Sequence, residues 1–184
     1  MNYAHYQQLF DDILNGSNTQ PPYDKESYLQ YTKLNHSRMK RWDKHGELTG
    51  EVIAALKAIT VPQHWIIITE PWCGDAAHCV PFLIKMAEQN PLITYELQLR
   101  DSPPFLIESY LTNGSKSIPK LIVRDANGKD MFMWGPRPAG AEAVRLQLKD
   151  EDFETLKVGL QNWYNADKGK EVCSEMAALL GQQN

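Results

Sequence analysis

The sequence predicts an α/β fold, with a central sheet flanked by helices and additional helices at both ends of the chain. From Gln63 onward, β-strand and helix patterns alternate in the order β-α-β-α-β-β-α. Before and after that segment, apolar residues recur at helical spacing. We therefore expect a helical N-terminal extension over residues 1–60, and an α/β domain that includes C-terminal helices over residues 61–184.

Three helices are predicted in the N-terminal extension. The first covers residues 3–14 and ends at Asn15-Gly16. The second runs over residues 25–44 and is broken by His45-Gly46. Thr49 is a typical N-cap residue and predicts the start of the third helix. None of the three carries a recognisable enzyme motif.

The α/β segment begins with the β-branched run at residues 65–69, which is typical of a buried strand. Asn127-Gly128 lies between two apolar runs and predicts a β-hairpin. The other predicted strand lies at 93–99, and the predicted helices at 76–89, 105–111, 141–148, 153–164 and 172–180.

Composition limits the classes of function. A net charge of −4 argues against general nucleic-acid binding, and no segment approaches the roughly 18 apolar residues of a membrane helix. The N-terminal residues lack the basic and apolar regions of a signal peptide. Three widely spaced cysteines do not form a disulfide framework. We expect a cytoplasmic protein that binds neither nucleic acid nor membranes.

The most informative segment is Trp72-Cys73-Gly74-Asp75-Ala76, at the turn between the first strand and its helix. Free N–H groups and the helix dipole at such a position stabilise a thiolate. One interpretation of Cys73 is a partly exposed nucleophile with a low pKa. The other is an inert, buried thiol. Asp75 lies in the first helical turn and opposes a neighbouring thiolate.

Several residues in this order and spacing resemble the thioredoxin superfamily, in particular a bacterial group of the Trp-Cys-Gly-Asp type. The matching residues are Trp72-Cys73-Gly74, Pro81 eight residues after the cysteine, Ser117-Ile118-Pro119 and Gly135. The resemblance as a whole covers residues 63–148. The resemblance implies a thioredoxin fold with a mixed central sheet. It also implies a cis-proline at Pro119 facing Cys73, and a groove formed by Trp72, Gly74, Asp75, Ala76, Ile118 and Pro119.

Two departures from the family pattern bear on activity. Ala76 occupies the position of the second cysteine, and Ile67 that of the buried acid six residues before the first. The sequence therefore favours a monothiol thiol-disulfide oxidoreductase, in which Cys73 attacks a protein disulfide or a mixed disulfide and a low-molecular-weight thiol releases it. The alternative is a non-catalytic binding module with the same fold. Neither interpretation implies a metal or an organic cofactor.

The remaining candidates have simpler interpretations. Cys79 lies too far round the helix from Cys73 for a direct disulfide, and both Cys79 and Cys173 are interpreted as structural. A metal site at Cys73, His78 and Cys79 is disfavoured by their spacing, and His78 is expected on the solvent side of its helix.

Two further groups lie outside the Cys73 turn. Arg137 either faces an acidic ligand or is simply exposed. Aromatic residues of the N-terminal helices pack on the domain or on a second subunit, which leaves a homodimer open. The basic run is expected to be a solvated helix face: Lys33, Arg38, Lys40, Arg41 and Lys44.

Overall fold

Four strands form one mixed sheet in the order β2-β1-β3-β4 in the computed structural model, which describes residues 1–182. The strands are β1 (Gln63–Thr69), β2 (Ile93–Leu99), β3 (Lys120–Asp125) and β4 (Asp130–Trp134). β1 pairs in parallel with β2, while β3 runs antiparallel to both β1 and β4. This arrangement, flanked by helices, confirms the thioredoxin-like fold.

The central strand explains where the core lies. β1 has neighbours on both sides, and all of residues 65–69 are buried, as the run of β-branched side chains predicts. The predicted hairpin is present between β3 and β4. Gly128 has a φ of +79°, and the Asp125 carboxylate accepts hydrogen bonds from the backbone N–H groups of Asn127 and Lys129.

The helices agree with the predicted order but differ at their ends. They are α1 (Tyr3–Leu14), α2 (Glu26–His45), α3 (Gly50–Lys57), α4 (Gly74–Ala87), α5 (Ala139–Gln147), α6 (Phe153–Asp167) and α7 (Lys170–Gly181). Thr49 caps α3 as predicted, accepting from the N–H of Val52. The predicted helix over 105–111 is only a 3₁₀ turn, η1 (Leu106–Ser109), which lies between Phe105 in a left-handed conformation and Tyr110, whose φ of −132° is not helical.

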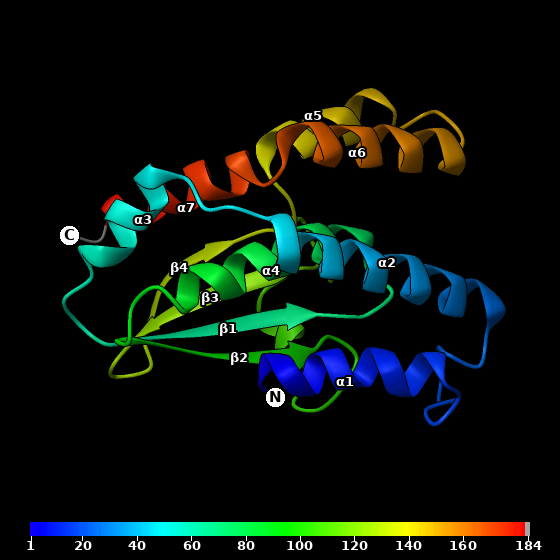
Figure 1. Cartoon of the computed structure of the whole chain (residues 1–184), viewed down its shortest axis with the longest axis horizontal. Helices are drawn as coiled ribbons and strands as arrows, with labels where there is room; N and C mark the ends of the chain where they lie inside the picture. Colours follow the sequence, from blue (N-terminus) through cyan, green and yellow to red (C-terminus); the bar gives the residue numbers. More distant parts are fainter. Residues whose placement is uncertain (183–184) are drawn as a thin grey trace.

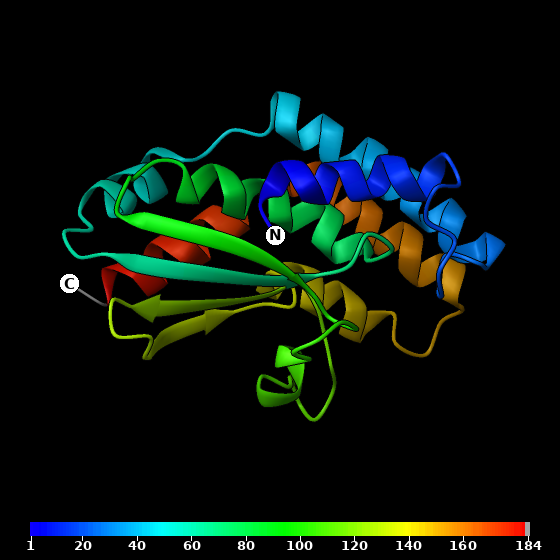
Figure 2. The ribbon, with the colours of Figure 1, turned by 90° about the horizontal axis from the view of Figure 1, so that it is seen from below.

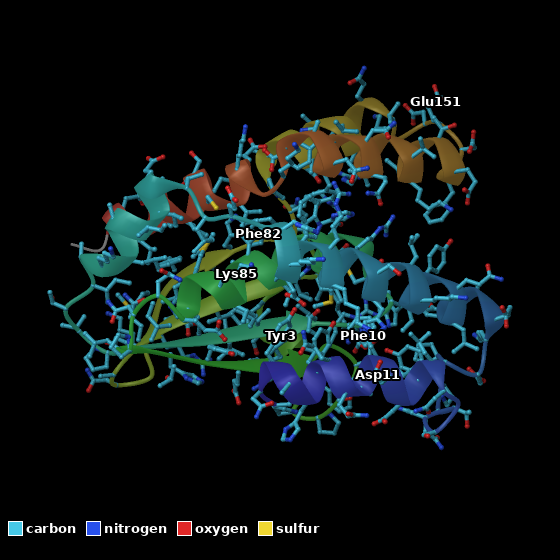
Figure 3. The ribbon with its side chains drawn as sticks, in the orientation of Figure 1. Tyr3, Phe10, Asp11, Phe82, Lys85 and Glu151 are labelled. Atoms are coloured by element: carbon cyan, nitrogen blue, oxygen red, sulfur yellow. The ribbon has the colours of Figure 1, made fainter. Side chains whose placement is uncertain are left out.

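The N-terminal helices pack directly on the α/β core. α1 lies along β2, and α2 packs against α4 (Figures 1 and 2). Tyr3 of α1 donates a hydrogen bond to Asp43 of α2 at 2.8 Å, and Lys85 of α4 donates to the Asp43 carbonyl at 2.8 Å. Figure 3 labels Tyr3 on α1 and Lys85 on α4, the two residues that bind Asp43. Three helices are thereby tied together beside the sheet.

The C-terminal helices complete the other side of α4. α5 and α6 lie side by side, and α7 packs against α3 (Figure 1). Phe82 of α4 fills the space beside Gly169, where any Cβ would overlap its ring. Among residues 1–182 no helix is both long and apolar enough to cross a membrane.

Candidate functional site

Cys73 ends the turn between β1 and α4 and acts as the N-cap of the helix. Its Sγ accepts a hydrogen bond from the Ala76 N–H at 3.5 Å, and its carbonyl accepts one from Ala77 at 3.1 Å. The Cys73 N–H in turn donates to the Glu70 carbonyl at 3.0 Å. This capping explains why α4 begins at Gly74, two residues before the predicted start.

The loop before β3 faces this turn. The Ile118–Pro119 peptide bond is cis, the form that the resemblance implies. Cys73 Sγ donates to the Ile118 carbonyl at 3.3 Å. Gly135 has a φ of +110° and lies so close to the Pro119 carbonyl that a side chain would overlap it. The fold thus brings Cys73, the proline loop and Gly135 to the same end of the sheet.

Of the residues predicted to form a groove, Trp72, Gly74 and Asp75 line a hollow beside Cys73, but Ala76 does not. Trp72 is half-buried: its ring meets Tyr28 of α2 edge-on at 5.8 Å, and the Arg100 guanidinium lies 4.6 Å from the ring centre. Ala76 is 1% exposed. Helix α2, from outside the thioredoxin-like sheet, therefore covers part of the predicted groove.

The environment of Cys73 contradicts the interpretation of a partly exposed thiol with a low pKa. Cys73 is only 8% exposed, and burial raises the pKa of its thiol to about 12, with a further contribution from the Asp75 carboxylate. Hydrogen bonds from the Ala76 and Asp75 N–H groups lower the pKa of the thiol, but burial raises it by more. Cys73 is therefore a protonated thiol at neutral pH.

Asp75 belongs to a polar network that joins three elements. Arg137, in the loop between β4 and α5, forms an ion pair with Asp75 at 2.6 Å and another with Glu142 at 2.6 Å. The Tyr164 hydroxyl of α6 donates to the other Asp75 oxygen at 2.8 Å. Arg137 is therefore neither an exposed loop residue nor free for an acidic ligand.

His78 is buried, contrary to the prediction of a solvent-side residue. It is 4% exposed, accepts a hydrogen bond from Trp42 Nε1 at 2.9 Å through Nδ1, and stacks on Tyr164 at 4.3 Å between ring centres. Burial lowers its pKa to about 3. The helix pattern could not reveal this because the residues that cover His78 come from α2 and α6.

The other two cysteines lie in the core. Cys79 and Cys173 are both 0% exposed, and all three cysteines are free thiols. Cys79 Sγ lies 3.9 Å from the Tyr164 hydroxyl. Within residues 1–182 no group of three or more His, Cys, Asp or Glu side chains is arranged to hold a metal ion.

Glu70 is a buried acid that lies outside the family's acid position. Ile67, at the family's acid position, is 0% exposed in the core. Glu70 is 4% exposed and accepts a hydrogen bond from the Asp101 N–H at 3.0 Å. Burial raises its pKa to about 7. The sequence feature that could have indicated Glu70 is its position directly after a strand with a buried pattern.

A cavity of about 420 Å³ lies beside Cys73, between α2, the start of α4, and α6. Tyr28, Arg38, Trp72, Asp75 and Tyr164 are among the residues that line it. Arg38 was expected on a solvated helix face, but it is partly buried, whereas Lys33, Lys40, Arg41 and Lys44 are exposed. Neither α2 nor α6 carries a motif that could have indicated this cavity.

Comparison with known proteins agrees with this fold. The sequence model of a family described as Thioredoxin matches residues 22–152, so the chain belongs to this thioredoxin-like family. No protein of curated function is significantly similar in sequence.

Two solved structures are similar over nearly their whole length. A protein of unknown function from Pseudomonas aeruginosa has 16% identity and a TM-score of 0.59, with 100% of this chain and 99% of that one covered. An HIV epitope-scaffold has 16% identity and a TM-score of 0.54, with 99% of each chain covered. At this identity they show the fold alone.

Proposed function

We propose that this protein is a thioredoxin-fold binding module whose ligand site is the cavity beside Cys73. The observation that carries the proposal is the state of Cys73, a thiol held protonated by burial in the wall of a 420 Å³ cavity. A cavity of that size is within the range of small-molecule sites in proteins. The position of the second family cysteine is filled by buried Ala76, which supplies no resolving thiol.

Monothiol exchange at Cys73 is the second candidate, and one arrangement favours it. The sulfur lies at the N-terminus of α4, accepts the Ala76 N–H and faces the cis-Pro119 loop. In this reaction the thiolate would attack a protein disulfide or a low-molecular-weight disulfide, forming a mixed disulfide and releasing one thiol. An external thiol would then attack the Cys73 sulfur of the mixed disulfide and release the second substrate thiol, and a further external thiol would restore Cys73, with the two external thiols leaving as a disulfide.

The rate of Cys73 alkylation against pH separates the two candidates. For a binding module we expect the iodoacetamide rate to rise about tenfold per pH unit from pH 7 to pH 10 without a plateau. We also expect little mixed disulfide with glutathione disulfide at pH 7 by intact mass. A plateau near pH 7, together with turnover that is lost in Cys73→Ser, would favour the oxidoreductase instead.

A further inference from the structure

Cations outnumber anions among the charged side chains that line the cavity beside Cys73. Arg38, Arg137, Arg145 and Lys157 contribute to its wall, against the single carboxylate of Asp75. Three of the four cations are paired with acids of the protein: Arg137 with Asp75 and Glu142, Arg145 with Glu142, and Lys157 with Glu154. These pairs compensate most of the charge of the wall.

Arg38 is the exception within the part of the chain that the structure describes. It forms no ion pair there, and its single hydrogen bond runs from Nη1 to the Asn35 amide oxygen at 2.9 Å. Asn35 is itself fixed, because its Nδ2 donates to the Pro71 carbonyl at 2.9 Å. Nη1 also lies 3.5 Å from the place that a Cβ at Gly74 would occupy. Arg38 is thus a positioned cation at the N-terminus of α4 that is not in direct contact with any carboxylate of the described residues.

The remaining walls are aromatic and apolar. Tyr28, Tyr31, Trp72 and Tyr164 line the cavity, and so does Phe153, which is 62% exposed. A second hollow of about 440 Å³ between α2 and α6 shares Arg38 with the first and adds Leu34 and Val158, which are 43% and 53% exposed. Large exposed apolar side chains beside a cavity are typical of ligand sites.

From this arrangement we infer that the cavity binds a small aromatic organic anion, whose acidic group pairs with Arg38 and whose ring packs among the aromatic side chains. The inference deepens the proposed function and rests on it, since it names the ligand class of the same cavity. Charge-assisted hydrogen bonds between a guanidinium and a carboxylate or phosphate are strong and directional. Asp75 does not oppose the anion freely, because Arg137 and Tyr164 occupy both of its oxygens.

The test uses 2-naphthoate as the probe, with calorimetry on the full-length protein at pH 7.5. The neutral amide 2-naphthamide has the same ring without the charge. We expect naphthoate to bind at least about tenfold more tightly than the amide, and Arg38→Gln to weaken naphthoate binding about tenfold or more. Lys40→Gln removes the same charge from an exposed position of α2 that lines neither cavity, and it should leave the affinity unchanged.

Two further measurements locate the probe and guard against misfolding. Naphthoate should slow alkylation of Cys73 at pH 9, with the Cys79 and Cys173 thiols as internal controls. Arg38→Lys keeps the charge and should retain more of the naphthoate affinity than Arg38→Gln, with thermal melting showing that both variants are folded.

The outcomes distinguish the inference from the proposed function. If the amide binds as tightly as naphthoate and both protect Cys73, the anion inference is wrong while the binding module stands. If neither compound binds, the inference is wrong and the binding module loses its ligand site. If naphthoate binds as inferred but Cys73 alkylation has a plateau near pH 7, the inference stands and the non-catalytic assignment falls.

Discussion

Arg137 binds Asp75 through two nitrogens that converge on the same carboxylate oxygen, with Nε at 3.0 Å and Nη2 at 2.6 Å from Oδ2. Both side chains are largely shielded, at 16% and 13% exposure. The pair joins the first turn of α4 to the loop after β4, so it fixes the surroundings of Cys73 from two distant parts of the sequence.

Asp75→Asn should therefore have two effects. Loss of the ion pair leaves Arg137 with only the Glu142 carboxylate, and we expect the unfolding free energy to fall by about 2 kcal/mol. The pKa of the Cys73 thiol should also fall, because the Asp75 charge is one of the causes that raise it. Urea unfolding and the pH dependence of alkylation measure the two effects.

A matched control for this variant is Glu154→Gln, whose carboxylate pairs with Lys157 and is 69% exposed. Exposed pairs contribute little, so its stability should change by no more than about 0.5 kcal/mol. An Asp75→Asn variant as stable as this control would contradict the structural role given to the Asp75–Arg137 pair.

Cys73 should be alkylated before the other two thiols. It is 8% exposed and lines a cavity, whereas Cys79 and Cys173 are 0% exposed. Timed reaction with iodoacetamide at pH 9, followed by peptide mass mapping, gives the order. Earlier modification of Cys79 or Cys173 would be incompatible with this packing.

Glu70 should make stability depend on pH. Its pKa rises from 4.5 to about 7 on folding, so the folded state favours the protonated acid. The stabilisation is fully present below pH 4.5 and is lost as the pH rises to about 7, with a total change of up to about 3 kcal/mol. Glu70→Gln keeps a neutral side chain of the same shape and should not show this loss.

The useful quantity for Glu70 is the difference between variant and wild type at each pH. His78, whose pKa is lowered to about 3, changes stability in the opposite direction over part of the same range, and the difference removes its contribution. Chemical denaturation between pH 4 and pH 8 should show Glu70→Gln gaining relative stability as the pH rises. If the difference in unfolding free energy between the variant and the wild type does not change with pH, folding does not raise the pKa of Glu70.

Ala76→Cys should create a disulfide with Cys73. Position 76 lies one helical turn from Cys73, and its N–H already contacts Cys73 Sγ at 3.5 Å. We expect loss of both thiols on mild oxidation, in the wild-type background and equally with Cys79→Ala. Persistence of two free thiols at these positions would show that the turn cannot adopt thioredoxin-like disulfide geometry.

Gly135→Ala should destabilise the fold more than a substitution at an unconstrained glycine. Gly135 combines a φ of +110° with a close approach to the Pro119 carbonyl, and we expect a loss of about 3 kcal/mol. Gly114, with a φ of +77° and open space around it, is the control, and its replacement by alanine should cost about 1 kcal/mol. Equal losses at both sites would show that contact with the proline loop is unimportant.

Short sequence patterns predicted correctly the structural features that depend on interactions between residues close in the sequence. The β-branched run of β1, the Thr49 cap and the Asn127-Gly128 turn each depend on neighbouring residues, and each was predicted correctly. The burial of Cys73 and His78 depends instead on contacts with α2 and α6. Those contacts join residues as far apart as His78 and Gln161, and no pattern within one helix contains them.

The position of α2 and α6 over the start of α4 limits which molecules can reach the Cys73 sulfur. Cys73 is 8% exposed and faces a cavity lined by side chains of both helices, so these helices limit how a folded protein surface can approach it. Molecules would be sorted by size and shape before any bond to sulfur could form. Helices α2 and α6, rather than the reactivity of the Cys73 thiol, would then determine which molecules reach the sulfur.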